Sequence, residues 1–335
     1  MVELLFFDVG QGDSIIIRWI DDLKVKYGII DCKLHQGRNP VLEYCRANQI
    51  EEIEFAVLSH PHFDHFSGFG EILDSVRLGD FTLKRFVHTS KVKSDYLATA
   101  NKSKEATNEL QKIFVTARYL RKNKGLKILV AEDDSDRIIK LGSEFKMQFL
   151  GPSSEEEDKF INKESYSTIN DEIPSANPLA NWLSTIIKIS NQEIAILLTS
   201  DAVKQALSRI GKSKSGNFAT QKLLFAQIPH HGAKTNHNQI FWNKLKKSTT
   251  TPVIISVGNK YNHPSQEVIT YFDKHQNYEL YRTDKLISFP STPKSVSTSK
   301  TLDLFTRSAT SRSITKDNYY QFSFTGVNFE VIKKS

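Results

Sequence analysis

The chain has 335 residues, of which 39% are hydrophobic and 25% charged, and a formal net charge of +7, a composition that excludes a largely disordered chain. Its two cysteines, Cys32 and Cys45, are too few for a disulfide framework. No apolar stretch approaches the roughly 20 residues that cross a bilayer, and the first residues lack the pattern of a signal peptide, so we expect a cytoplasmic protein that does not act on a membrane.

Apolar runs separated by turn residues predict the strands of the first sixty residues. These runs are residues 2–9, 14–20, 25–32 and 51–60. Residues 39–50 have apolar positions at helical spacing. The strand at 51–60 leads into the sequence LSHPHFDHFSGFG of residues 58–70, where a helix is expected to begin. This polar sequence therefore lies in a loop between a strand and a helix, where α/β proteins place their chemistry.

Strands and helices both recur in the rest of the chain. Strands are predicted at residues 142–152, 182–190, 193–201, 222–232, 251–258, 278–283 and 286–289, and helices at 95–124 and 264–275. The strands at 182–190 and 193–201 are expected to form a hairpin. Because strands occur in both halves with helices between them, we expect two sheets packed inside helical layers.

Charge is unevenly distributed along the chain. Residues 84–127 contain twelve Lys and Arg against three acidic residues, whereas residues 132–172 contain twelve acidic residues against five basic ones. A basic block favours a polyanionic partner such as nucleic acid. The alternative is a solvated helical face, since the sequence does not show that these charges converge in space.

Three histidines and one aspartate occupy six consecutive positions: His60, His62, Asp64 and His65. Side chains along such a loop alternate in direction, and the resulting two pairs suit two metal ions about 3.5–4 Å apart. A bridging carboxylate and a further ligand are available at later strand ends, from Asp201 and from His230 or His231. Imidazole and carboxylate without thiolate favour Zn²⁺, Mn²⁺ or Fe in a hydrolytic site over a structural zinc site.

Some of these residues have a simpler interpretation. Asp201 precedes the segment AVKQALSRI and would suit the start of a helix as its N-cap. The His230–His231 pair would also suit a structural role. His88 is expected to be an ordinary histidine at the end of a strand.

The order of motifs over residues 3–290 resembles the metallo-β-lactamase superfamily, and within it the C-terminal hydrolase domain of the competence protein ComEC. The matching segments are FFDVGQGDSIII, IIDCK, LSHPHFDHFSGF, NWLSTIIKI, ILLTSDA, IPHHGAKTN, ISVGNKYNHPSQEVI and LYRTD. The resemblance implies an α/β fold, the αββα sandwich of two mixed sheets flanked by helices. It also implies two divalent metal ions at one edge of the sheets, with Zn²⁺ and Mn²⁺ as the favoured ions.

The same resemblance implies a role for each matching residue. The metal ligands would be His60, His62, Asp64, His65, Asp201 and His230, the last preferred to His231. The first two would share one ion, the next two the other, and Asp201 would bridge both. Residues bordering the site would be Asp8, Gln11, Gly12, Asp13, Asp31, Asn181, Ser184 and His263. Of these, Asp31 would orient the histidine loop, and His263 or His231 would protonate the leaving group.

The chain departs from the family in two respects. Many members supply a third histidine to the first ion from the middle of the chain, but no histidine stands between His88 and His230 here. The first ion is therefore expected to be held more weakly. ComEC is a membrane protein with a channel, and this chain shows no membrane segment, so DNA import is not carried over.

We expect a hydrolase domain over residues 1–290, with a basic helical insertion at about 91–127 and an acidic excursion at about 153–180. A Ser/Thr/Lys-rich linker or loop over 291–318 and a C-terminal β-hairpin, a strand appendage over 319–335, would follow.

The expected function is metal-dependent hydrolysis, in which a hydroxide bridging the two ions attacks a phosphodiester of DNA or RNA. The basic residues 84–127 would bind the nucleic acid. A small-molecule phosphodiesterase, for phosphocholine esters or nucleotides, is the first alternative, ahead of lactonase, thioesterase or β-lactamase activity. A subunit with a weak metal site, active only with a protein partner encoded nearby, is an alternative of a different class.

Overall fold

The structure is a computed structural model. It describes residues 1–89, 103–133, 138–163, 178–213, 218, 220–247, 250–258, 262–286, 318–325 and 328–334. Part of the basic insertion, the predicted linker up to residue 317 and residues 164–177 of the acidic excursion lie outside these ranges. The division into domains therefore stays a prediction.

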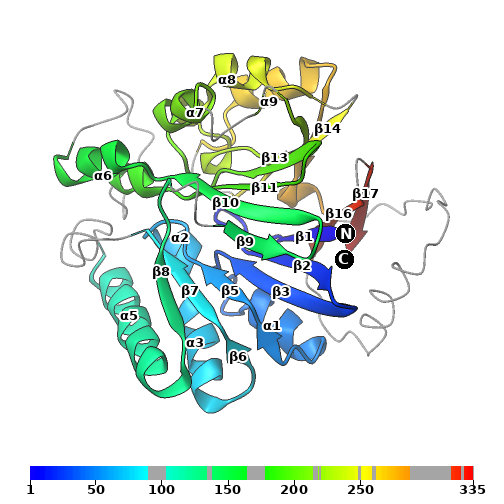
Figure 1. The fold of residues 1–335 in the computed structure, drawn as a ribbon. Helices are drawn as coiled ribbons and strands as arrows, with labels where there is room; N and C mark the ends of the chain where they lie inside the picture. The colour runs from blue at the N-terminus through cyan, green and yellow to red at the C-terminus, as the bar shows by residue number, and fades with distance from the viewer. Residues whose placement is uncertain are drawn as a thin grey trace.

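Eight strands form the first sheet, in the order β17-β16-β1-β2-β3-β5-β7-β8 (Figure 1). Their bounds are β1 Val2–Phe7, β2 Ile15–Asp21, β3 Lys24–Ile30, β5 Phe55–Val57, β7 Arg85–His88, β8 Lys127–Val130, β16 Tyr319–Thr325 and β17 Asn328–Lys334. The single strand predicted at 51–60 is divided, because β4 Glu52–Ile53 pairs with β6 Thr82–Leu83 outside this sheet.

The C-terminal hairpin of β16 and β17 completes one edge of the first sheet. β16 runs antiparallel to β1, with Val2 opposite Phe324 and Phe7 opposite Tyr319. Just beyond this pairing, the backbone N–H of Asp8 donates to the carbonyl of Asn318 at 2.9 Å. The hairpin therefore supports the start of the turn that leads from β1 to β2.

Seven strands form the second sheet, in the order β15-β14-β13-β12-β11-β10-β9. Their bounds are β9 Ile138–Leu141, β10 Phe145–Gly151, β11 Ile186–Ser190, β12 Ile194–Leu198, β13 Lys222–Gln227, β14 Thr251–Ile255 and β15 Tyr278–Arg282. β11 and β12 form the predicted hairpin, and β12 to β15 are parallel. Their carboxyl ends consequently share one edge of the sheet.

The two sheets pack face to face through apolar side chains that alternate along the strands. In β1, Val2, Leu4 and Phe6 belong to the core between the sheets, whereas Leu5 and Phe7 belong to the other core cluster. Across the inter-sheet core the Phe6 and Phe225 rings lie 5.5 Å apart.

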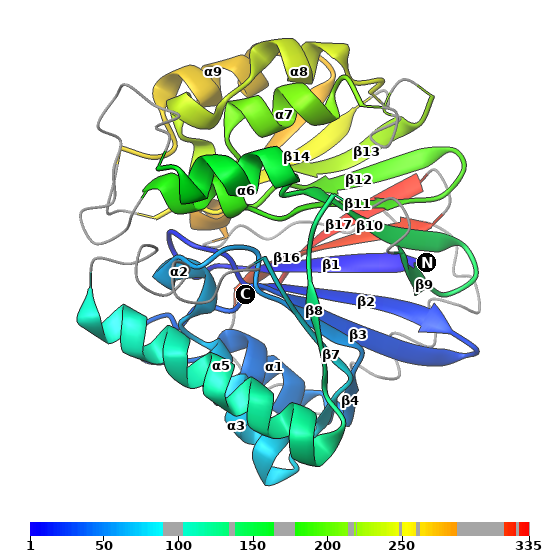
Figure 2. The ribbon, with the colours of Figure 1, turned by 60° about the vertical axis from the view of Figure 1, so that its left-hand side comes forward.

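Helices cover both outer faces (Figures 1 and 2). Those beside the first sheet are α1 Pro40–Ala47, α2 Phe63–Phe66, α3 Phe69–Leu78 and α5 Lys104–Lys124, and those beside the second are α6 Ser154–Ile161, α7 Lys204–Ile210, α8 Gln239–Lys244 and α9 Gln266–Lys274. Short 3-10 turns are η1 Pro178–Leu183, η2 His230–Gly232, η3 Lys234–Asn236 and η4 Thr283–Lys285. This αββα arrangement confirms the predicted fold class.

In the part of the chain that the structure describes, the basic and acidic stretches of the sequence are explained by the helices on which they lie. Helix α5 starts at the N-cap Ser103, buries an apolar stripe and carries Arg121, Lys122 and Lys124 in its last turn, where positive charge complements the helix dipole. Three glutamates occupy the first turn of α6 behind a capping box at Ser153. Among the described helices, none is both long enough and apolar enough to cross a bilayer.

Candidate metal centre

The histidine loop, residues 59–66, follows strand β5 and includes the short helix α2. His60 and His65 are completely buried and His62 is 1% exposed. The Nε2 atom of His60 lies 3.0 Å from Nδ1 of His62, and the His60 and His65 ring centres are 4.2 Å apart. Nitrogen atoms this close at the end of a strand form a compact set of potential ligands.

Asp201 lies three residues after β12, at the centre of the site. Its Oδ1 is 3.4 Å from His65 Nε2 and 3.5 Å from His231 Nε2. Its Oδ2 is 3.5 Å from His60 Nε2 and 3.6 Å from His230 Nε2. Each carboxylate oxygen is thus approached by two imidazole nitrogens. Helix α7 begins at Lys204 with Val203 at the N-cap, so the interpretation of Asp201 as a helix cap is wrong.

The two adjacent histidines after β13 have an unusual backbone. His230 and His231 have φ angles of +49° and +52°, in the left-handed region that costs most residues about 1–2 kcal/mol. Such strain is concentrated at functional sites. The consequence is that both Nε2 atoms face Asp201, one toward each oxygen.

His231, rather than the preferred His230, lies beside the second pair of ligands. Its Nε2 is 3.6 Å from Asp64 Oδ2, and Asp64, His65 and His231 form one compact group of potential metal ligands. His60, His65 and Asp201 form another. The role of proton donor that the sequence suggested for His231 does not fit this position.

The donor set fits divalent metal ions. Among the residues that the structure describes, His65 Nε2, His231 Nε2 and both oxygens of Asp201 are buried and have no hydrogen-bond partner. Leaving such atoms unpaired costs roughly 1–3 kcal/mol each, and more for charged groups. Imidazole and carboxylate ligands suit Zn²⁺, Mn²⁺ or Fe. These buried clusters can therefore hold divalent metal ions.

The pKa shifts in the cluster follow from burial and from Asp201. Burial lowers the pKa of His60 to about 4, so its imidazole is neutral near pH 7. In His65 and His231 burial also lowers the pKa. The negative charge of Asp201 helps to outweigh this effect, and the pKa of each histidine is raised. Burial would raise the pKa of Asp201, yet the surrounding imidazoles, His230 first, hold it well below its usual value. Because metal ligands bind in their deprotonated form, metal binding at His65 and His231 competes with protons.

Asp31 supports the histidine loop from behind. Its Oδ2 lies 2.7 Å from His65 Nδ1 and accepts a hydrogen bond from Ser59 Oγ at 2.6 Å. Its Oδ1 accepts from the Ser59 backbone N–H at 2.8 Å. These bonds turn His65 Nε2 toward Asp201, which is the orienting position that the sequence predicted for Asp31.

We expect Asp31→Asn to weaken metal binding by about 10- to 100-fold, since the amide no longer presents a carboxylate to His65. The fold should persist, because Ser59 N–H can still donate to an oxygen at this position. Titration against a chelator measures the change, with exposed Asp273→Asn as the control. Equal affinities of the two variants would contradict the assigned role.

Two aspartates of the turn between β1 and β2 have structural contacts. Asp13 is buried and accepts from Gln227 Nε2 at 2.7 Å and from Ser256 Oγ at 2.5 Å. It thereby ties the turn to the ends of β13 and β14. Asp8 Oδ1 accepts from the Gly10 backbone N–H at 3.2 Å, a bond that closes the turn locally.

Two of the predicted bordering residues, Asn181 and His263, lie beside His230. His230 Nδ1 lies 3.4 Å from Asn181 Nδ2 and 2.9 Å from Asn236 Oδ1, and the ring of His263 is centred 5.2 Å from that of His230. Ser184 is buried with an unpartnered Oγ.

Sequence reasoning missed Asn236, Ser59 and Ser200, whose side chains lie within hydrogen-bond distance of His230 or His60. It also missed Gln227, which accepts from the backbone N–H of Ser200. The two serines directly precede ligands in the sequence, which is the one signal that pointed to them.

His88 ends β7 and is buried against Phe114, with ring centres 5.0 Å apart. This agrees with the expectation of an ordinary strand-end histidine.

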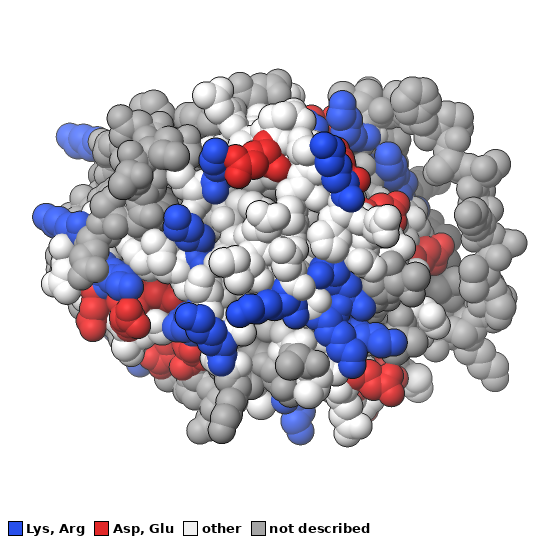
Figure 3. Space-filling model, turned by 90° about the horizontal axis from the view of Figure 1, so that it is seen from above, with Lys and Arg blue, Asp and Glu red and all other residues white. Residues whose placement is uncertain are grey.

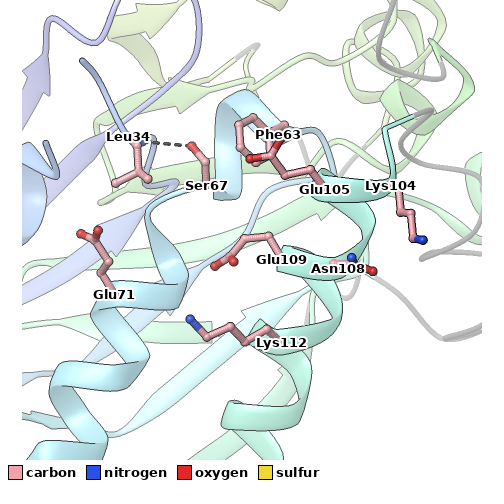
Figure 4. Close-up of a pocket in the computed structure, with 9 residues that line it drawn as sticks. All are labelled: Leu34, Phe63, Ser67, Glu71, Lys104, Glu105, Asn108, Glu109 and Lys112. Carbon is pink, nitrogen blue, oxygen red and sulfur yellow. Dashed lines mark hydrogen bonds between the residues drawn. The ribbon is translucent and has the colours of Figure 1, made fainter. Parts of the chain in front are cut away.

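A pocket of about 640 Å³ opens beside the histidine loop, between α2, α3 and the first half of α5 (Figure 4). Its lining residues are Leu34, Phe63, Ser67, Glu71, Lys104, Glu105, Asn108, Glu109 and Lys112. Phe63, between His62 and Asp64 in the sequence, is 41% exposed. Three carboxylates and two ammonium groups give the pocket a mixed charge.

No protein-family model matches the chain, and no curated protein does. Among solved structures, the metallo-beta-lactamase fold protein YhfI from Bacillus subtilis is 10% identical, with a TM-score of 0.44, over 84% of this chain and 97% of that one. Zn²⁺-bound PqqB from Methylobacterium extorquens is 7% identical, with a TM-score of 0.46 and the same coverage. A long form RNase Z from yeast is 11% identical, with a TM-score of 0.40, over 77% of this chain and 37% of that one. Likenesses this distant carry no argument about activity.

Proposed function

We propose that this chain is a metal-dependent hydrolase that uses two divalent ions to cleave phosphodiesters, and that its substrate is DNA or RNA. The observation that carries the proposal is the placement of Asp201. Two imidazole nitrogens approach each of its oxygens at 3.4–3.6 Å, and the carboxylate has no hydrogen-bond partner in the described part of the chain. A buried carboxylate in this position suits a bridge between two ions.

The proposed ligands divide between two sides of Asp201. Oδ1 faces the first side, which holds Asp64, His65 and His231. Oδ2 faces the second side, whose proposed ligands are His60 and His62, with His230 at the same oxygen. We propose that His230 supplies the third imidazole on the His60 side, which many members of the resembled family take from the middle of the chain.

Bound divalent ions supply Lewis acidity and make water acidic enough to act as a nucleophile near neutral pH. The chain's own groups orient that chemistry. Asp31 fixes the direction of His65, and Asn236 fixes that of His230. His263, buried against His230, is our proposed proton donor to the leaving group.

Positive surface charge supports a nucleic-acid substrate. Exposed Lys204, Lys212, Lys244 and Lys246 lie on and beside α7 and α8, and Figure 3 shows Lys and Arg side chains gathered on the face that holds these helices. In residues 84–127, by contrast, acids partly neutralise the described bases. Lys84 pairs with Glu52 and Glu54, Arg85 with Glu54, and Lys112 with Asp74. The sequence resemblance to the ComEC hydrolase domain favours the same class of substrate.

The mixed-charge pocket favours a second candidate function, a phosphodiesterase for small molecules. Its volume of about 640 Å³ is in the range of pockets that bind one small organic molecule. Glu71, Glu105 and Glu109 in its lining would repel a polyanionic strand.

Metal analysis and a cleavage panel test both candidates. We expect about two transition-metal ions per chain and hydrolysis of linear, circular or single-stranded DNA, or of RNA, with Mn²⁺ or Zn²⁺. The double variant His62→Ala/Asp64→Ala is the control and should lose both ions and turnover. Cleavage of only bis(p-nitrophenyl) phosphate or other small diesters would favour the second candidate. A folded wild-type protein that binds no metal would exclude both.

A further inference from the structure

Gln11, in the turn between β1 and β2, buries a side-chain amide that makes no hydrogen bond. The residue is 5% exposed, and within the described part of the chain neither its Nε2 nor its Oε1 has a partner. An unpaired buried amide costs roughly 1–3 kcal/mol for each unsatisfied group. Its amide therefore destabilises the fold in the absence of a bound partner.

The backbone at Gln11 is fixed from several sides. The Lys33 ammonium donates to the carbonyls of Val9 and Gln11. A side chain at Gly258, just after β14, would overlap the backbone and Cβ of Gln11. Gly258 must therefore stay a glycine for this turn to pack. The backbone and Cβ of Gln11 are thus fixed, whereas its amide has no hydrogen bond within the described residues.

The next two residues place the turn directly against a proposed metal ligand. A Cβ at Gly12 would overlap the carbonyl oxygen and the Cβ of Asp64, and the φ of Gly12 is +122°. The backbone N–H of Asp13 donates to the Asp64 carbonyl at 3.2 Å. Gln11 is thus one residue away from a close contact between this turn and the proposed ligand Asp64.

Gln227 shows what a structural glutamine looks like in the same region. It is 3% exposed, and its Nε2 donates to Asp13 Oδ2 at 2.7 Å. Its Oε1 accepts from the backbone N–H groups of Thr199 and Ser200 at 3.1 and 3.0 Å. Both polar atoms of the Gln227 amide are thus hydrogen-bonded within the fold, whereas the same group of Gln11 remains available to a ligand.

We propose that Gln11 is a substrate-binding residue whose Nε2 donates a hydrogen bond to a phosphoryl oxygen at the metal centre. This rests on the proposed phosphodiester substrate. A phosphoryl oxygen is an anionic acceptor, and a hydrogen bond to a charged group contributes more than one between neutral groups. A neutral amide donor suits this position because it adds no charge beside the metal ligands.

The substitution Gln11→Met tests the proposal, since methionine has a similar length and no amide. In metal-loaded protein we expect inorganic phosphate to bind about 10- to 100-fold more weakly and kcat/KM for a phosphodiester to fall by a similar factor. Metal content should stay at the wild-type value, and the thermal midpoint should not fall and is expected to rise slightly, because an unpaired buried amide is removed. Gln227→Met, the matched substitution, should lower the thermal midpoint because three hydrogen bonds are lost. Exposed Gln276→Met should change nothing.

Unchanged phosphate binding and kcat/KM in Gln11→Met would overturn the proposal. So would a loss of metal or a lowered thermal midpoint like that of Gln227→Met, because Gln11 would then be structural. Wild-type protein that binds phosphate through Gln11 but cleaves no diester would overturn the proposed function and leave this assignment standing. Wild-type protein that neither binds phosphate nor cleaves diesters would overturn both. If phosphate binds too weakly to measure, kcat/KM alone decides.

Discussion

Replacing Asp201 with asparagine is expected to remove both metal ions and to lower phosphodiester hydrolysis by about 1000-fold or more, equivalent to about 4 kcal/mol of barrier. Asparagine keeps the size of the side chain but not its charge. Asp201 faces imidazole nitrogens of His60, His65, His230 and His231. Without the carboxylate, each proposed ion loses its bridge, and the repulsion between the two ions is no longer offset.

Metal content and thermal unfolding with and without Zn²⁺ or Mn²⁺ measure this effect. Wild-type protein should gain about 2.7 kcal/mol for each site when free metal is at a hundred times the dissociation constant, whereas Asp201→Asn should gain almost nothing. Exposed Asp158→Asn is the control for the same chemical change. An Asp201→Asn protein that still held two ions would contradict the bridging role.

His231→Asn is expected to remove one of the two ions and to lower hydrolysis by about 100-fold or more, since the remaining ion no longer has a partner. Asparagine is chosen because it tolerates the left-handed backbone, where His231 has a φ of +52°. Its loss should affect the ion proposed to lie between Asp64 and His65, the group to which His231 belongs.

His230→Asn is the matched variant, with a φ of +49° at the neighbouring position. We expect it to weaken the ion on the His60 side, because His230 Nε2 approaches the same oxygen of Asp201 as His60 Nε2. Metal titrations of the two variants should therefore differ. His231→Asn should lose the binding step of the ion beside Asp64 and His65, and His230→Asn should weaken the binding step of the ion on the His60 side. Identical titrations, or full metal content in His231→Asn, would contradict the division of ligands.

The sequence predicted most of the fold because its strands are apolar runs bounded by turns. β1, β2, β13 and β14 are buried along nearly their whole length, and such runs are recognisable without a structure. β8 and β9 are short and partly exposed, so they lack this signal. The division of residues 51–60 depends on the pairing of β4 with β6, a tertiary contact that no local pattern contains.

The candidate site was predictable as a set of residues but not as a geometry. The spacing of His60, His62, Asp64 and His65 shows that ligands are crowded together. Which of two consecutive histidines faces which oxygen depends on two left-handed backbone angles, and these are set by surrounding contacts such as that of His230 N–H with the Ser200 carbonyl. The resemblance placed Gln11 at the border of the site but gave it no role, because an unpaired amide is visible only when its neighbours are known.

The pairing of β1 with β16 sets an order of events during synthesis and folding. β1 can pair with β2 as soon as both are made, but its other partner, β16, begins only at Tyr319. Until then the apolar strand VELLFF has one open edge, a template for pairing with other chains. The bond from Asp8 to Asn318 forms at the same late stage. The turn that carries Gln11 thus acquires its final support only after β16 has been made, so maturation of the site is expected to be among the slowest steps of folding.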